Sequence, residues 1–165
     1  MIKAIFATDL SHGFGIGGGL PWPPIKEDFT HFKAVTKNNY IAMGYNTYKT
    51  LPKLKGRTPV VILDLENRGL PDLGTPHPLW TGAESFIADL SWLSYKEIAD
   101  VCIIGGTSLL TTEALESCDE IHHTTVKGVY EADTYVSAET MAYLSTLNQE
   151  ILLESERCII RKYTK

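Results

Sequence analysis

The sequence predicts a single-domain α/β protein with a mixed, mostly parallel sheet, helices on both faces and an antiparallel strand at its C-terminal edge. Apolar, β-branched segments alternate with helical patterns along most of the chain, which is typical of a parallel sheet covered by helices. No helical pattern separates the last two strand segments, so we expect them to pair as an antiparallel hairpin. The 165 residues contain no repeat or linker, so one domain over residues 1–165 is expected.

Local patterns define the expected elements. The strand pattern occurs at Ile2–Thr8, 40–43, 59–63, 101–104, 121–126, 151–154 and 158–162. The helical pattern occurs at Lys26–Thr36, 46–51, 84–93 and 108–115. Residues 66–78, with three prolines and two glycines, are expected to form a surface connection within the domain.

Charge and cysteine usage narrow the class of function. The net charge is −5 and lysines and arginines do not cluster, which argues against nucleic acid or an anionic membrane as partner and favours a small molecule. Cys102, Cys118 and Cys158 form no CxxC pair, so we expect reduced thiols and no metal site. Residues 1–8 are too short for a signal-peptide core, and no apolar run approaches the ~20 residues that cross a bilayer. A cytoplasmic monomer is therefore expected.

A glycine-rich stretch at residues 14–19 leads into Pro21-Trp22-Pro23-Pro24. Glycine gives the backbone freedom to move or to approach a ligand, whereas the prolines are stiff, so one interpretation is a mobile flap on a rigid hinge. The alternative is an ordinary glycine-rich loop, and the glycine content alone does not decide between them.

The helix predicted at Lys26–Thr36 carries an acid on its apolar face. A helical wheel places Ile25, Asp28, Phe29, Phe32, Val35 and Thr36 on one side and Glu27, His31 and Ala34 on the other. Burial should raise the pKa of Asp28 and suits a carboxylate reserved for a cationic or N–H-rich ligand, with Glu27 as its solvated neighbour. The alternative is that Asp28 only complements the helix dipole in the first turn.

Two strand-to-helix turns contain glycine and are candidate anion sites. Residues 101–110 read as a buried strand, then Gly105-Gly106, then a helix start capped by Thr107 or Ser108. Residues 43–48 repeat the order of strand, glycine and helix start. Neither is a GxGxxG fingerprint, so simple turns remain the alternative.

Together these motifs resemble the dihydrofolate reductase family over the whole chain. The markers are Leu20-Pro21-Trp22, Asp28 with Phe29 and Phe32, Met43-Gly44 with Thr47, Gly56-Arg57, Ile104-Gly105-Gly106, Thr124 and Asp133-Thr134. Each marker is weak alone, whereas their joint order and spacing are specific. The resemblance implies hydride transfer from NADPH to C6 of 7,8-dihydrofolate, which gives tetrahydrofolate.

The resemblance also implies residue roles. The expected catalytic set is Asp28, Trp22, Leu20 and Thr124, with Asp28 acting indirectly as water near Trp22 and Leu20 delivers a proton to N5. The expected substrate site is Ile5, Ala7, Asp28, Phe29, Phe32, Thr47, Leu51, Arg57, Ile104 and Thr124, with Arg57 on the glutamate α-carboxylate. The expected cofactor site is Ala7, Phe14, Leu20, Gly44, Tyr45, Asn46, Thr47, Leu63, Asp64, Gly105, Gly106, Thr107, Ser108 and Leu109, with a cis bond between the paired glycines.

The sequence also departs from the family pattern. The Pro23-Pro24 insertion is similar to vertebrate members, while the short middle is similar to phage or plasmid-borne forms. Tyr45 and Leu63-Asp64 stand where the family usually places basic or hydroxyl groups for the 2′-phosphate, so we expect NADPH with weak discrimination against NADH. The rival classes are the riboflavin-pathway reductase on the same scaffold and a non-catalytic folate-binding or virion protein.

Overall fold

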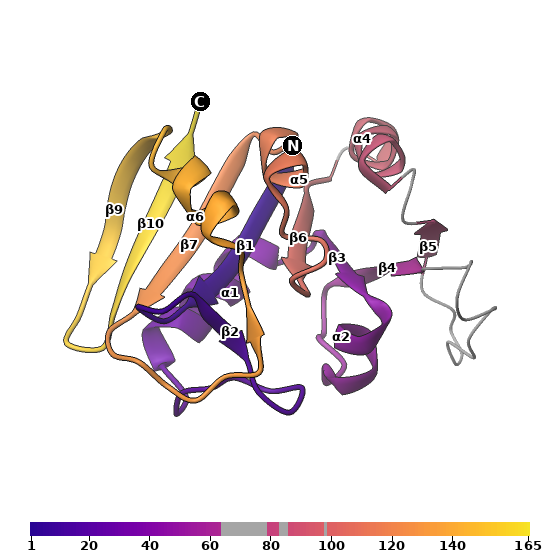
Figure 1. The fold of residues 1–165 in the computed structure, drawn as a ribbon. Coiled ribbons are helices and arrows are strands. Elements are labelled where there is room, and N and C mark those ends of the chain that lie inside the picture. Colours follow the sequence, from indigo (N-terminus) through magenta and orange to yellow (C-terminus); the bar gives the residue numbers. More distant parts are fainter. Residues whose placement is uncertain (64–78, 83–85, 98) are drawn as a thin grey trace.

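The fold was analysed in a computed structural model, which describes residues 1–63, 79–82, 86–97 and 99–165 (Figure 1). The elements in chain order are β1 (Ile2–Thr8), β2 (Gly13–Gly15), α1 (Lys26–Thr36), β3 (Tyr40–Gly44), α2 (Tyr45–Thr50), β4 (Thr58–Leu63), β5 (Leu79–Gly82), α4 (Phe86–Glu97), β6 (Val101–Gly105), α5 (Thr112–Glu116), β7 (Glu120–Val126), β8 (Thr134–Tyr135), α6 (Ala138–Leu144), β9 (Asn148–Glu154) and β10 (Cys158–Thr164).

The main sheet has eight strands in the order β5-β4-β3-β6-β1-β7-β10-β9. All neighbours from β5 to β7 pair in parallel, whereas β10 is antiparallel to both β7 and β9. The predicted mixed sheet and its antiparallel hairpin at one edge are therefore confirmed. The outermost strand is β9, and the C-terminal strand β10 lies between it and β7. β2 and β8 form a separate small ribbon.

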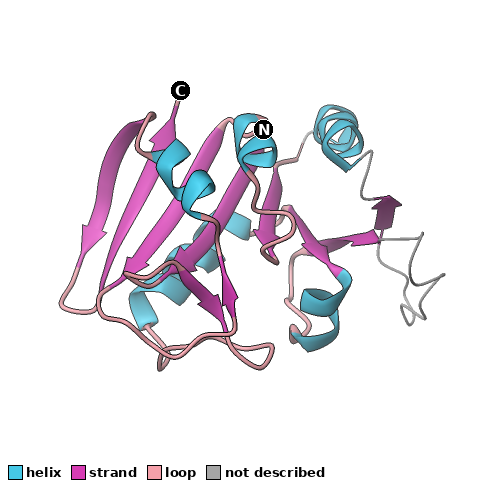
Figure 2. Ribbon diagram, viewed as in Figure 1, coloured by secondary structure: helices cyan, strands magenta, loops and turns pink. Residues whose placement is uncertain are grey.

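Different helices cover the two faces of the sheet, because successive side chains of a strand point to opposite sides. Ala4 and Phe6 of β1 belong to a core that includes residues of α4, α5 and α6. Ile5, between them, belongs to a second core against which Phe32 and Val35 of α1 pack. Figures 1 and 2 show α1 behind the sheet and α5 and α6 in front of it. Helices on both faces are thus confirmed.

Several boundaries differ from the sequence prediction. The helix expected at 108–115 begins only at Thr112, because the Thr111 hydroxyl caps it by accepting from the Ala114 N–H at 3.2 Å. The helix expected at 84–93 is described from Phe86 to Glu97. β2, β5, β8 and α6 were not predicted, and all four are short. The predicted connection at 66–78 lies outside the described residues.

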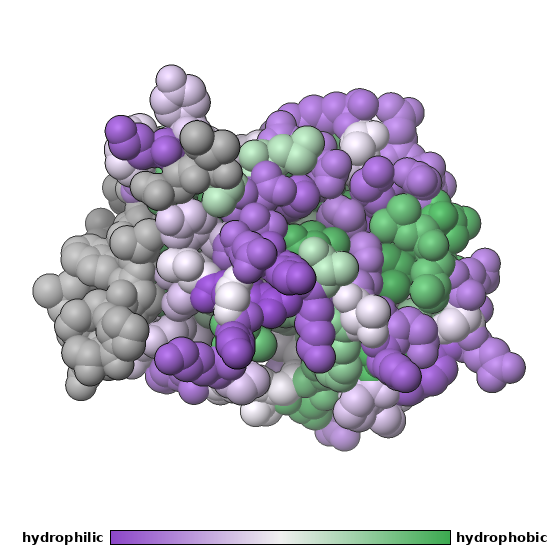
Figure 3. Space-filling view, turned by 180° about the vertical axis from the view of Figure 1, so that it is seen from behind, coloured by the Kyte–Doolittle hydropathy of each residue, from purple (hydrophilic) through white to green (hydrophobic). Residues whose placement is uncertain are grey.

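The edge strand β9 exposes all seven of its residues. Figure 3, a view from behind, shows hydrophobic side chains gathered at this edge, where Ile151, Leu152 and Leu153 are exposed. Among the described residues, no helix is long and apolar enough to span a membrane.

Candidate active site

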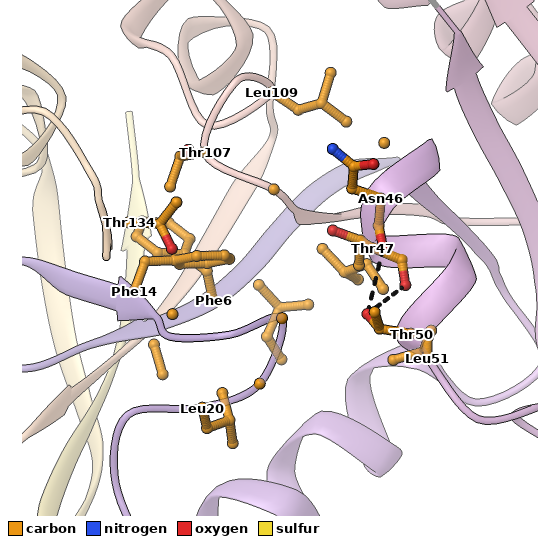
Figure 4. A pocket seen from close by; sticks show the side chains of 18 of the residues that line it. Phe6, Phe14, Leu20, Asn46, Thr47, Thr50, Leu51, Thr107, Leu109 and Thr134 are labelled. Carbon is orange, nitrogen blue, oxygen red and sulfur yellow. Dashed lines mark hydrogen bonds between the residues drawn. The ribbon is translucent and has the colours of Figure 1, made fainter. Parts of the chain in front are cut away.

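A cavity of about 1340 Å³ opens where several parallel strands end. Ala7 of β1, Gly44 of β3, Leu63 of β4 and Ile104 of β6 all line it. The carboxyl ends of parallel strands meet at one edge of a sheet, and ligands of open α/β sheets bind there. Figure 4 shows the cavity between α2, which carries Asn46, Thr47 and Thr50, and the Phe14–Thr134 side, with Leu20 on the glycine-rich loop.

Most of the predicted site residues line this cavity. They are Ile5, Ala7, Phe14, Leu20, Asp28, Phe29, Phe32, Gly44, Tyr45, Asn46, Thr47, Leu51, Arg57, Leu63, Ile104, Gly106, Thr107, Ser108 and Leu109. Segments that are far apart in the sequence therefore share one wall, as the resemblance to a known family led us to expect.

Asp28 is the acid that lines the cavity from α1. It stands in the first turn of α1, and its Oδ1 accepts a hydrogen bond of 2.7 Å from the hydroxyl of Thr124, a buried residue of β7. Burial raises the pKa of the Asp28 carboxyl, the Thr124 bond opposes this shift, and the nearby charge of Glu27 adds to it. The site thus holds a carboxyl that gains from meeting a donor or a cation on a ligand.

The face of α1 opposite Asp28 is only partly solvated: Ala34 is exposed, as the helical wheel predicted, whereas Glu27 and His31 contact protein. Glu27 Oε2 accepts from the Ser155 hydroxyl at 3.1 Å, next to the β9–β10 turn. His31 Nε2 lies 3.0 Å from His122 Nδ1 on β7, and burial together with His122 lowers the pKa of His31 to about 4. The wheel assumed one buried face, whereas α1 also contacts β7 through His31 and the β9–β10 turn through Glu27.

Arg57 precedes β4 and lines the cavity. Its Nη1 and Nη2 each donate at 2.7 Å to a backbone carbonyl, that of Lys55 and that of Lys33, and its Nε donates to the Thr36 hydroxyl at 3.1 Å. Because these bonds use three of the five N–H donors, the guanidinium is fixed in place and keeps donors for a carboxylate.

Close backbone approaches form the floor of the cavity between β3 and β6. The bond between Gly105 and Gly106 is cis, and Gly105 has a φ of 134°, which favours glycine. A Cβ on Gly105 would lie 2.9 Å from the Phe14 ring, and a Cβ on Gly44 would lie 3.9 Å from the Gly106 nitrogen. The predicted helix start at Thr107 or Ser108 is wrong, because residues 106–110 form turns before α5 begins at Thr112. The floor is a glycine-lined turn.

Comparison with known proteins identifies the family. A family model for dihydrofolate reductase matches residues 1–157. The chain belongs to the dihydrofolate reductase family. It is 34% identical over 148 residues to dihydrofolate reductase type 8 of Escherichia coli, covering 85% of this chain and 82% of that protein. It is 31% identical over 140 residues to the dihydrofolate reductase of Mycoplasma pneumoniae, covering 84% of each.

The fold is shared with a solved member of the family. The structure of dihydrofolate reductase from Enterococcus faecalis, complexed with NADP(H) and RAB-propyl, superposes with a TM-score of 0.75 at 22% identity and covers 99% of this chain and 95% of that chain. As a member of the family, the chain is an oxidoreductase that acts on dihydrofolate.

In this dihydrofolate reductase family member, two loops are joined over one end of the cavity. The Gly17 N–H donates to Asp133 Oδ2 at 2.9 Å, and the Asp133 N–H donates to the Gly15 carbonyl at 2.9 Å. Nearer the base of the loop, the buried carboxylate of Asp9 accepts from the N–H groups of Ser11, Gly13 and Tyr130 at 2.8 to 2.9 Å. The glycine-rich segment is thereby tied to the 130–133 loop.

The proline segment after that loop is also fixed. The Arg157 guanidinium donates to the carbonyls of Pro24 and Pro23, at 2.7 and 2.9 Å. Trp22 is buried against Ile25 and Val126, behind the cavity wall. Its Nε1 has no hydrogen-bond partner among the described residues.

Some predicted residues lie off the lining, and some lining residues were missed. Trp22, Thr124 and Gly105 stand behind it, and Asp64 lies outside the described residues. The lining residues that are absent from the predicted site sets are Phe6, Gly15, Gly18, Gly19, Lys33, Thr50, Pro52, Leu54, Ile62, Phe86, Asp133 and Thr134. Of these, Asp133 and Thr134 were recognised only as family markers, and the glycines only as part of a possible flap. The helical wheel did not place Lys33 of α1 on the apolar face, and no sequence pattern marks Phe86. Among the described residues, no group of three His, Cys, Asp or Glu side chains is placed to hold a metal.

Proposed function

We propose that this cavity binds 7,8-dihydrofolate and NADPH together and yields tetrahydrofolate. The observation that carries the proposal is the Asp28 carboxyl, which is hydrogen-bonded to Thr124 and stands on the same helix as the lining residues Phe29 and Phe32. NADPH, when bound, supplies the hydride that reaches C6 of the pterin.

The substrate lies along α1. The pyrimidine edge, which is rich in N–H donors, meets Asp28 and Thr124, and a charge-assisted hydrogen bond there is about twice as strong as a neutral one. Apolar side chains flank the pterin on both sides of the cleft. They are Ile5, Ala7, Phe29, Phe32, Leu51 and Ile104, with Thr47 at the end of the wall. The free donors of Arg57 take the glutamate α-carboxylate.

Protonation of N5 makes C6 a better hydride acceptor, and Asp28 promotes it indirectly. The carboxylate binds the ring and raises the proton affinity of the site, while Thr124 fixes the carboxylate in position. Leu20, which is exposed on the loop, and Trp22 flank the path by which a water delivers the proton. The buried Nε1 of Trp22, which has no partner among the described residues, supports this path because it is available to donate to such a water.

The cofactor lies across the carboxyl ends of β3 and β6. Gly44 and Gly106 have no side chains, which leaves room for a diphosphate beside their backbones. The hydroxyl residues Thr47, Thr107 and Ser108 also line this part of the cavity. The nicotinamide end then reaches Ala7, Phe14 and Leu20, with Gly105 behind it. Tyr45, Asn46, Leu63, Asp64 and Leu109 complete the cofactor side. Of these, Asp64 lies outside the described residues.

The glycine-rich loop closes the nicotinamide end and excludes water. Arg157 holds Pro23 and Pro24, which supports a rigid hinge, and we expect motion to be confined to residues 9–19. In the conformation described, hydrogen bonds to Asp9 and Asp133 hold this loop in place. Excluding water protects hydride transfer from competing reactions.

NADPH is the cofactor, with NADH as a weaker substitute. Tyr45 adds no positive charge, and an acid at position 64 disfavours a 2′-phosphate, whereas Arg68 is a candidate to attract one. Residues 64 and 68 lie outside the described residues. We expect Asp64→Ser to sharpen the preference for NADPH and Arg68→Ala to weaken it.

We also infer a divergent, phage- or plasmid-like member with a vertebrate-like Pro-Trp-Pro-Pro segment, acting as a cytoplasmic monomer that binds neither nucleic acid nor membranes. Three free, buried cysteines and a net charge of −5 support this setting. Size-exclusion chromatography with light scattering tests the oligomeric state.

The deciding assay follows absorbance at 340 nm with dihydrofolate and NADPH. Loss of signal needs both ligands and the chemistry, and product analysis should give tetrahydrofolate. Tight binding of both ligands without turnover would instead indicate a folate-binding protein that has lost catalysis.

A further inference from the structure

Lys49 stands over the ring of Tyr45 at one end of the active-site cavity. Its Nζ lies 5.0 Å from the ring centroid, a cation–π contact made possible because residues four apart share a helix face. Tyr45 lines the cavity and packs against Val61 and Leu63 of β4. Lys49 is exposed and makes no ion pair with any residue that the structure describes. The ammonium is therefore a positive charge held at the rim.

The Lys49 ammonium lies on the side of α2 near the end of β4, because Tyr45, whose ring it covers, packs against Val61 and Leu63. In dinucleotide-binding α/β folds, the phosphates lie at a glycine-containing strand-to-helix turn, and the ribose 2′ position is read at the end of a neighbouring strand. Here the turn is Gly44 between β3 and α2, and the neighbouring strand is β4, which ends at Leu63. Tyr45 and Leu63 both line the cavity at that end.

The other basic lining residues lie far from this end. Lys33 and Arg57 are the basic side chains among the described lining residues, and Arg57 donates to the Lys33 carbonyl. Arg57 comes just before β4 begins, whereas Leu63 ends it, so the strand separates them by roughly 20 Å at 3.3 Å per residue. Neither can meet a phosphate beside Leu63.

We propose that Lys49, held on the Tyr45 ring, reads the 2′-phosphate of NADPH in place of a basic residue at position 45. This proposal rests on the function proposed above. The tyrosine does two things: its face restrains the long lysine side chain, and its position beside Leu63 directs the ammonium toward the ribose. Because a restrained ammonium loses less conformational entropy when it binds, the charge acts with less cost than a free surface lysine would.

Equilibrium binding tests the proposal without turnover. Isothermal titration calorimetry with 2′,5′-ADP and 5′-AMP isolates the contribution of the 2′-phosphate, and NADP⁺ and NAD⁺ serve as whole ligands. Lys49→Met should weaken 2′,5′-ADP and NADP⁺ by about fivefold, the range of an exposed charge pair, and leave 5′-AMP and NAD⁺ unchanged. The salt dependence of NADP⁺ binding should fall as well.

Companion variants separate charge from structure. Lys49→Arg should restore discrimination, because a guanidinium also stacks on an aromatic ring. Tyr45→Phe should keep it, whereas Tyr45→Leu should lose part of it by releasing Lys49. Lys53→Met is the matched control, since it removes another exposed lysine just after α2 and should leave the ratio unchanged.

Two results would overturn the proposal. One is an unchanged ratio of NADP⁺ to NAD⁺ affinity in Lys49→Met while both ligands still bind, which refutes the role of Lys49 and leaves the proposed function standing. The other is that Lys53→Met lowers the ratio as much as Lys49→Met, which reduces the effect to general surface charge. A wild-type chain that binds neither dinucleotide would refute the proposed function together with this inference.

Discussion

Replacing Asp28 with Asn tests the central assignment of the site. The change keeps the size of the side chain and an oxygen for the 2.7 Å bond from Thr124, but removes the negative charge. A hydrogen bond to a charged group contributes about 1.5–3 kcal/mol, or roughly 10- to 10²-fold in rate when it is lost from the transition state. Adding the loss of assisted protonation, we expect kcat/KM at neutral pH to fall by about 10²-fold or more.

The pH dependence and a matched control sharpen this test. Activity of the Asn variant should partly recover at low pH, where the substrate is already protonated in solution. Glu27→Gln removes the neighbouring acid, which faces Ser155 and not the cavity, and should change kcat/KM by less than about threefold. Steady-state kinetics from pH 5 to 9 measure both variants. Similar small effects of the two substitutions would refute the reasoning.

The pH dependence of thermal stability tests the environment of the Asp28 carboxyl independently of catalysis. Because burial raises the pKa of Asp28 above 3.8, the native state holds this proton more tightly than the unfolded state does. The Asp28 contribution to stability is therefore fully present below about pH 3.8 and is lost as pH rises through the raised pKa. Asp28→Asn should melt at a higher temperature than the wild type at pH 7, and the difference should vanish in acid. A lower melting temperature at pH 7 would contradict this.

Three further outcomes are expected. Arg57→Lys should raise KM for dihydrofolate by about tenfold because one ammonium cannot replace a planar fork, and KM for dihydropteroate, which has no glutamate, should not move. Asp9→Asn should lower the free energy of unfolding by about 2–4 kcal/mol in urea titrations, since an amide cannot accept all three N–H bonds, whereas a change under 0.5 kcal/mol would refute that role. Cys102 and Cys118, whose pKa values burial raises to about 12, should resist alkylation at pH 8 until the chain unfolds, which mass spectrometry would detect.

The sequence by itself determined the elements whose signals are local. The period of 3.6 set α1 at its observed bounds, and the β-branched runs set the central strands, because burial on a sheet or along a helix face leaves a repeating pattern. The absence of a helix before β10 likewise predicted the antiparallel hairpin. The joint order and spacing of motifs that are weak singly, such as Leu20-Pro21-Trp22 and Gly105-Gly106, indicated the family without any knowledge of long-range contacts.

Only the tertiary structure decided which side chains meet. The strand order that places β6 between β3 and β1 is not written in any local pattern, and it is what brings Gly106 against Gly44. The helical wheel did not predict the contact between His31 and His122, because a wheel assumes that a helix packs against one surface, whereas α1 packs against two. The same limit applies to Lys49, since its exposed position on a short helix means little until Tyr45 and the end of β4 are seen beside it. Local sequence sets what each segment can bury, whereas long-range packing decides against which partner it is buried.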